Sequence, residues 1–374
     1  MIAEHLSKVI GNRLGGSERE RKASEFITKK FEELELEVEV QEFKFLGWKP
    51  TRDTEVEILK PEKKIVPSMP MLYSESTPEE GVEGIVKKVG IMYIVPGLIE
   101  WPKYAITSKK GKELAYLVAH PDGPPIPMPL VEPIFMSSNV IIGEETMKEL
   151  DNWISNGKEV KARISIAGEY ESGLISRNII ATLEGKENPE EEIVVCAHYD
   201  SALWSPGAND NASGVEAMFY AAEKLVSEGT NRTIKFIAFG SEEWNLFGSR
   251  YYVNYIKERR MLKKVKAVID LDMVGAGDTL NILSAPEEFR NEIKENVVKV
   301  VEDAGFKYNI TPVENIRGGS DHYPFHVEGI PVVLMFFWPY RYYHQKEDTA
   351  DKLSSKAIKT AGDTAVEIVK RILS

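Results

Sequence analysis

Short apolar runs alternate with longer amphipathic stretches from about residue 175 to the end of the chain, and this alternation constrains the fold more than any other feature. Runs rich in Val, Ile and Leu predict strands at 178–183, 192–200, 233–240, 265–273, 279–283 and 331–337, with helical patterns at 213–228, 245–259, 286–304 and 351–373. This order predicts an α/β fold with a mixed, largely parallel sheet flanked by helices. Such folds bind ligands at the carboxyl ends of their strands, where functional side chains are therefore expected.

The rest of the chain predicts two further parts. Residues 17–35 show the three- and four-residue apolar spacing of an amphipathic helix, and the period-two alternation that follows predicts a strand up to residue 45. Residues 46–168 hold most of the prolines and several short β-like runs, with a helical pattern at 144–156. We therefore expect 46–168 to form a separate, mainly-β module.

Composition excludes several classes of function. The chain has 374 residues, 43% of them hydrophobic and 28% charged, which fits a globular protein. A net charge of −12 disfavours nucleic acid or an acidic membrane as a partner. The single cysteine, Cys196, cannot form an internal disulfide, and the start lacks the apolar core of a signal peptide. We expect a cytoplasmic protein without a spanning helix, and the sequence leaves the oligomeric state open.

Metal-capable side chains follow several of the predicted strands. They are His198 and Asp200, then Asp210 in the next loop, Glu242 and Glu243, Asp270 and Asp272, and His344 near the end of the chain. Each alone has an ordinary explanation, such as a helix cap or a solvated face. These ordinary explanations do not account for one acid or histidine at each of several neighbouring strand ends. Such groups, when buried together, need a cation to offset their charge. Histidine and carboxylate ligands without cysteine favour Zn²⁺ or a similar hydrolytic ion.

Five segments in order resemble the catalytic blocks of the M28 di-zinc peptidases, which include leucyl-type aminopeptidases and glutamate carboxypeptidase II relatives. They are HYD…GANDNASG, SEEWNLFGSRYY, DLDMVG, SDHYPF…GIPVV and YYHQKEDT, within about 170–374. The resemblance implies the zinc exopeptidase fold, peptide substrates and two Zn²⁺ per chain, with other divalent ions as possible substitutes. The helix at 17–35 resembles the family's N-terminal element, which implies that 1–45 belongs with 169–374 in one catalytic domain and that 46–168 is an insert.

The resemblance also implies a role for each matching residue. It implies that His198 and Asp272 bind one zinc, that Glu243 and His344 bind the other, and that Asp210 bridges both. Glu242 matches the general base, Tyr343 the tyrosine that polarises the substrate carbonyl, and Asp200 the carboxylate behind the first histidine. The family usually has Asn where this chain has Asp270, and Asp272 is favoured as the ligand because Met-Val-Gly follows it.

The expected function is that of a metallo-exopeptidase that removes N-terminal residues. A carboxypeptidase of the glutamate carboxypeptidase II type is an alternative; it needs cations for the substrate carboxylate, and Arg317 and Arg341 lie near the relevant blocks. A non-catalytic binding protein is the third reading. Outside the five blocks, the segment before residue 185 resembles the end of a protease-associated (PA) domain. We interpret His322 as part of a surface or pocket-lining turn, and Trp204 as either a loop anchor or part of the substrate mouth.

Overall fold

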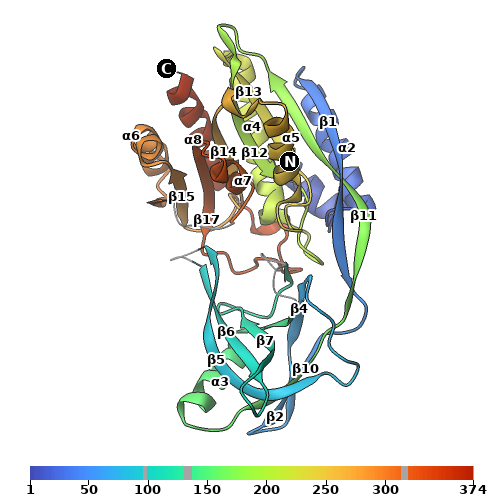
Figure 1. The fold of residues 1–374 in the computed structure, drawn as a ribbon. Helices are drawn as coiled ribbons and strands as arrows, with labels where there is room; N and C mark the ends of the chain where they lie inside the picture. The colour runs from blue at the N-terminus through green and yellow to red at the C-terminus, as the bar shows by residue number, and fades with distance from the viewer. Residues whose placement is uncertain (96–98, 130–136, 313–318, 374) are drawn as a thin grey trace. The chain divides into compact units, whose positions relative to one another are not determined.

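The computed structural model describes residues 1–95, 99–129, 137–312 and 319–373, and the chain divides into two compact units (Figure 1). Unit 1 comprises Met1–Phe45 and Ile175–Ser374, and unit 2 comprises Leu46–Leu174. The chain leaves unit 1 within strand β1 (Glu37–Pro50) and returns within β11 (Gly168–Leu183). The predicted return at residue 169 thus falls at the start of β11, whereas the division between the units falls inside that strand.

Unit 1 is built on a mixed eight-stranded sheet in the order β1-β11-β13-β12-β14-β17-β15-β16. The central strands β13, β12, β14 and β17 run parallel, while β11 and β15 join the sheet antiparallel to their neighbours β13 and β17. The bounds of these strands are β12 Asn188–His198, β13 Arg232–Phe239, β14 Val265–Leu271, β15 Thr279–Ala285, β16 Lys307–Pro312 and β17 Val332–Trp338. The predicted α/β class with a mixed sheet is confirmed.

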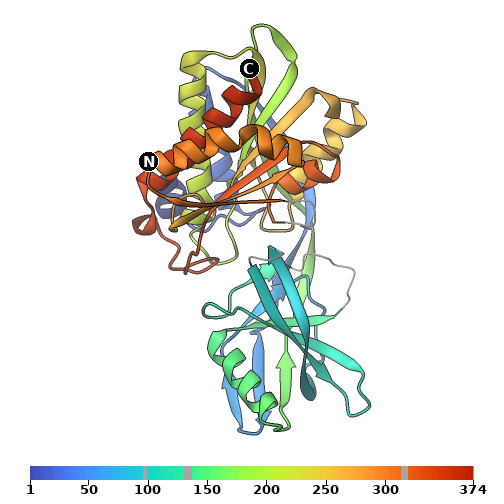
Figure 2. The same ribbon diagram turned by 90° about the vertical axis from the view of Figure 1, so that its left-hand side faces the viewer.

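Helices cover both faces of this sheet. Those of eight residues or more are α2 (Glu18–Glu32), α4 (Gly214–Glu228), α5 (Phe247–Glu258), α6 (Glu287–Asp303) and α8 (Ser355–Leu373); α1 (Ile2–Glu4) and α7 (His322–Val327) are shorter. Figure 2 shows α6 and α8 side by side over the sheet. Together with α2 and α4 they bury one continuous apolar core against alternate strand residues such as Val195, Ile269 and Met335. On the other face, the ring of Phe239 packs against Tyr252 of α5 and Phe325 of α7.

The sequence of α2 shows why this N-terminal helix forms and docks. Ser17 caps it, since its hydroxyl accepts a hydrogen bond from the Glu20 amide at 3.1 Å. The first turn carries acidic side chains and the last turn carries lysines, which complements the helix dipole. The stripe of Ala23, Ile27 and Phe31 is fully buried, and Phe31 stacks on Phe219 of α4.

Unit 2 is mainly β. Its nine-stranded sheet has the order β3-β2-β10-β5-β6-β7-β9-β4-β8, and its one long helix, α3 (Glu144–Ser155), buries Leu150 and Trp153. The strands are β2 Glu55–Lys60, β3 Lys64–Val66, β4 Ser68–Leu72, β5 Val82–Val95, β6 Ile99–Thr107, β7 Glu113–Ala119, β8 Met128–Pro129, β9 Ser138–Ile142 and β10 Lys161–Ser165. The identification of this unit as a PA domain stays a prediction. In either unit, no helix within the described ranges is both long and apolar enough to cross a membrane.

Glu20 connects α2 to the sheet through a buried carboxylate. It accepts hydrogen bonds from the Ser176 hydroxyl at 2.7 Å and from the Tyr199 hydroxyl. Burial raises the pKa of Glu20 to about 7, although these hydrogen bonds oppose the shift. The folded state therefore holds a proton on Glu20 at pH values where the unfolded chain has released it.

Replacing this carboxyl is expected to change how stability depends on pH. Because the folded pKa is raised, the free energy of unfolding falls as pH rises from about 4.5 to about 7, by up to about 3 kcal/mol. Glu20→Gln removes this contribution, so the variant gains stability relative to the unsubstituted protein over that range. Denaturant unfolding at pH 5 and pH 8 measures the gain, with Glu32→Gln on the exposed face of the same helix as the control. Equal gains for the two variants would contradict the assignment.

Candidate metal centre

The parallel strands of unit 1 bring the predicted residues to one edge of the sheet. β12 ends at His198, the turn after β13 carries Glu242 and Glu243, and Asp272 follows β14. His344 lies in the segment after β17, and Asp210 lies in the segment Ala208–Ser213 that precedes α4, at a kink where its own backbone is not helical. The carboxyl ends of parallel neighbours share an edge, so side chains from distant parts of the sequence meet there.

Asp210 lies between the two histidines and presents a different oxygen to each. Its Oδ1 is 3.2 Å from Nε2 of His198, and its Oδ2 is 3.1 Å from Nε2 of His344. Asp272 joins the His198 side, with 3.4 Å between its Oδ1 and the same Nε2. Glu243 joins the His344 side, with 3.1 Å between its Oε2 and Nε2 of His344. Three groups among the described residues are compact enough to hold a metal ion, and two of them, His198 with Asp210 and Asp272 and Glu243 with Asp210 and His344, share the Asp210 carboxylate. The third group is made of His198, Glu242 and Glu243.

Glu242 stands beside these groups and is more accessible than most of them. Its Oε2 lies 3.9 Å from Nε2 of His198. The Glu242 side chain is 13% exposed, against 1% for His198 and 3% for Glu243. The two adjacent carboxylates therefore differ in exposure, and Glu242 keeps a small exposed area that Glu243 lacks.

Asp200 supports the cluster from behind. Its Oδ1 lies 3.4 Å from Nδ1 of His198, and its two oxygens accept hydrogen bonds from the amides of Glu242 at 3.1 Å and Glu243 at 3.2 Å. One buried carboxylate therefore fixes both an imidazole ring and the turn that carries two acids. A carboxylate on the second nitrogen of a histidine orients the ring and makes it a stronger ligand.

The geometry separates Asp270 from Asp272. Asp270 points to the α7 side of the sheet, where its Oδ2 accepts from the His322 amide at 2.9 Å and lies 3.2 Å from Nδ1 of the same residue. Of these two aspartates, Asp272 belongs to a compact metal-capable group of described residues and Asp270 does not. Of the two alternatives for His322, the surface turn is wrong, because the side chain is fully buried against Asp270, and the pocket-lining turn stays a prediction.

Tyr343 lies next to the cluster, with its ring against His344 and edge-on to Trp338. Burial raises the pKa of its phenol well above the ordinary value, and the charges of Asp210 and Glu243 raise it further. The hydroxyl therefore carries its proton at neutral pH and is available as a donor.

The carboxylates and imidazoles strongly perturb one another. Burial raises the pKa of Glu242 well above its ordinary value; His198 opposes this shift, and the charge of Glu243 adds to it. Burial lowers the pKa of His344, but the facing acids Glu243 and Asp210 outweigh it and leave the pKa well above its usual range. Clusters of this kind are typical of functional sites.

The donor set fits divalent metal ions. Among the described residues, Nε2 of His198, Oε1 of Glu243 and Oδ1 of Asp272 are buried and make no hydrogen bond. Unpaired polar atoms of this kind are costly in a folded protein unless a ligand satisfies them. The cluster holds more carboxylates than cationic groups, so a dication would also offset its charge. Imidazole nitrogens and carboxylate oxygens are common zinc ligands.

Several positioning groups escaped the sequence analysis, although some lie inside the quoted segments. Asp348, in YYHQKEDT, accepts from the amides of Asn209 at 2.8 Å and Asp210 at 3.1 Å. Asn211, in GANDNASG, donates to the Leu271 carbonyl at 2.8 Å. These bonds set Asp210 against the end of β14. Side chains that bond to backbone carry no spacing pattern of their own, so only the fold reveals them.

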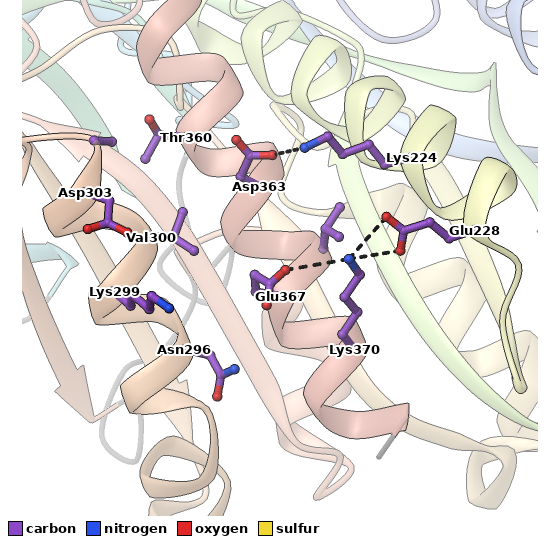
Figure 3. Close-up of a pocket in the computed structure, with 12 residues that line it drawn as sticks. Lys224, Glu228, Asn296, Lys299, Val300, Asp303, Thr360, Asp363, Glu367 and Lys370 are labelled. Atoms are coloured by element: carbon purple, nitrogen blue, oxygen red, sulfur yellow. Dashed lines mark hydrogen bonds and ion pairs between the residues drawn. The ribbon is translucent and has the colours of Figure 1, made fainter.

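Trp204 is not a member of the compact metal-capable groups. Trp204 is half exposed in the loop after β12, and Arg317 lies outside the described residues. A groove of about 630 Å³ runs between α4, α6 and α8 (Figure 3). Two of its lysines are paired, Lys224 with Asp363 and Lys370 with Glu228. The groove contains neither histidine nor any of the predicted site residues.

Known proteins resemble both the sequence and the fold. Residues 178–369 match the family described as Peptidase family M28. The chain is 28% identical over 391 residues to aminopeptidase YwaD of Bacillus subtilis (strain 168), covering 97% of this chain and 82% of that protein. An aminopeptidase from Aneurinibacillus sp. strain AM-1 superposes with a TM-score of 0.72 at 25% identity, covering 98% of this chain and 93% of that one.

A second solved structure, BSAP, a zinc aminopeptidase from Bacillus subtilis, has a TM-score of 0.70 at 24% identity, covers 100% of this chain and 94% of that one, and supports the fold alone. The family match extends over more than half of the chain and includes every residue of the cluster. The chain therefore belongs to peptidase family M28.

Proposed function

We propose that this protein is a zinc aminopeptidase that hydrolyses the N-terminal peptide bond of peptides at a centre with two metal ions. The observation that carries the proposal is the position of Asp210, whose two oxygens face two separate groups of ligands. His198 and Asp272 would hold one ion, Glu243 and His344 the other, and Asp210 both. Aminopeptidases among the relatives support the substrate class, and the buried, unsatisfied imidazole and carboxylate atoms of the cluster support the metal.

The residues of the chain suit such a hydrolysis. Zinc, when bound, supplies Lewis acidity, which lowers the pKa of a bound water and polarises a carbonyl oxygen. Glu242 is the general base: it accepts the proton of the attacking water and returns it to the leaving amine. The Tyr343 hydroxyl donates to the carbonyl oxygen as negative charge develops there. Asp200 holds His198 and the Glu242 turn in place.

Removing the proposed base is expected to separate chemistry from metal binding. Glu242→Gln keeps the size of the side chain and leaves the ligands intact, so the variant should keep its zinc. Its turnover should fall by at least about 100-fold, because a positioned base contributes 10²–10⁴-fold. Zinc analysis alongside kcat on an amino-acid anilide measures both. Near-normal turnover with full zinc would show that another group is the base.

Removing the bridging carboxylate is expected to abolish both properties. Asp210→Asn cannot offer an anionic oxygen to each of the two ligand groups, so zinc content and activity should fall together. Asp270→Asn is the matched control, since Asp270 contacts His322 instead of the cluster. We expect two zinc ions per chain in the unsubstituted protein and in Asp270→Asn. Fewer than one per chain in the unsubstituted protein would favour a non-catalytic binding protein.

Substrates blocked at one end test which terminus is attacked. An aminopeptidase should cleave an amino-acid anilide and spare an N-blocked dipeptide, with loss of activity on addition of a chelator and recovery with Zn²⁺. The opposite preference would favour a carboxypeptidase of the glutamate carboxypeptidase II type. Arg341, one of the cations considered for that alternative, is exposed.

A further inference from the structure

Arg13 is an unusual residue in unit 1, because its charged side chain is completely buried. It lies in the segment between the first short helices and α2, far in sequence from the catalytic strands. The guanidinium donates to the carbonyl oxygens of Tyr199, Pro206 and Gly207, the last two at 2.6 and 2.8 Å. All of these acceptors belong to the loop that leads from His198 to Asp210.

The neighbouring Asn12 holds the same loop from the same side. Its Nδ2 donates to the carbonyls of Ala202 at 2.7 Å and Ser205 at 2.9 Å, and lies 3.1 Å from the Ser201 hydroxyl. The Arg13 amide also donates to the Ser201 hydroxyl at 3.0 Å. The N-terminal segment thus supplies hydrogen bonds along most of the loop, which has no regular secondary structure of its own.

The loop passes close to the bridging carboxylate. Gly207 adopts φ +61°, and a Cβ there would lie 2.4 Å from the Asp210 carbonyl and 3.2 Å from Nη2 of Arg13. The backbone at Gly207 is therefore packed between the guanidinium and the residue that bridges the two ligand groups. A shift of the guanidinium would move this backbone, and Asp210 with it.

Arg13 also places a positive charge behind the cluster without pairing to a carboxylate directly. Its hydrogen bonds within the described chain go to backbone carbonyls, while the charges of Asp200, Asp348, Asp210 and Glu243 act on it from nearby. Burial lowers the pKa of Arg13 to about 10, which leaves the guanidinium charged at neutral pH. A buried cation of this kind offsets part of the repulsion among the acids.

We infer that Arg13 is a positioning residue of the metal centre, which fixes the loop between His198 and Asp210 and compensates the charge of the cluster, so that zinc affinity depends on the N-terminal segment. The inference rests on the proposed zinc centre. Arg13 contributes in two ways. Its hydrogen bonds to three backbone carbonyls require a guanidinium, whereas its positive charge could also come from a lysine.

Two substitutions distinguish these contributions. Arg13→Lys keeps the charge and loses the fork of donors, so zinc affinity should fall by about 10-fold. Arg13→Met removes both, and affinity should fall by about 100-fold. The controls are Arg21→Lys and Arg21→Met on the exposed face of α2, where Arg21 pairs with Glu18 and Glu25. These should bind zinc as the unsubstituted protein does.

The experiment uses the full chain, freed of metal by a chelator and titrated with Zn²⁺ in competition with a chromophoric chelator. The Co²⁺ absorption spectrum reports the ligand geometry, and thermal unfolding of each metal-free protein reports stability. Weaker binding in the order Arg13→Lys, then Arg13→Met, with an altered Co²⁺ spectrum, supports the inference.

A purely structural role would lower the thermal stability of the Arg13 variants and leave the affinity of the folded proteins unchanged, which would overturn the inference. If Arg13→Met does not fold, Arg13→Lys decides: unchanged affinity and spectrum overturn it, and a loss of about 10-fold supports it. Absence of zinc binding by the unsubstituted protein would instead refute the proposed function on which the inference depends.

Discussion

The accumulation of buried negative charge at one edge of a parallel sheet is the constraint on which the rest of unit 1 depends. Asp200, Asp210, Glu243 and Asp272 lie within hydrogen-bonding reach of two imidazoles, in a region from which solvent is almost excluded. Carboxylates buried this closely repel one another, and each loses its hydration. An arrangement of this kind is maintained only where cations and backbone donors compensate it, and the surroundings of the cluster supply both.

The compensation is distributed over parts of the chain that are distant in sequence. The Asp200 carboxylate accepts hydrogen bonds from amides in the turn after β13, and the Asp348 carboxylate accepts them from amides in the loop before α4. Asn211 connects that loop to the end of β14 through its hydrogen bond to the Leu271 carbonyl. Each of these groups holds backbone to which a cluster residue is attached. These supports connect different strands and loops, so the position of any one cluster residue depends on several parts of unit 1 at once.

The fold of unit 1 and the membership of the cluster could be predicted from sequence, because both have periodic or residue-type signals. The apolar runs specified β12, β13, β14 and β17, and the acids and histidines after them were expected to converge. The two-residue repeat of a strand could not distinguish Asp270 from Asp272 as a ligand, since residues two apart in a strand point to the same face. Their different roles follow from α7, whose short helix brings His322 onto Asp270. Contacts of this kind join residues that are far apart in sequence, as those of Arg13 do, so the spacing of neighbouring residues does not predict them.

The discontinuity of unit 1 has a physical role in this view. A chain that began at residue 175 would contain every predicted ligand, yet it would lack α2, Asn12 and Arg13. Without them the loop between His198 and Asp210 would lose most of its donors, and the Tyr199 hydroxyl would lose its bond to Glu20. Loops without regular structure keep a single conformation only when their backbone groups are satisfied by surrounding side chains. The N-terminal 45 residues thus supply hydrogen bonds to the loop between two of the predicted ligands, and they belong to the same compact unit despite the long insert that separates them from it in sequence.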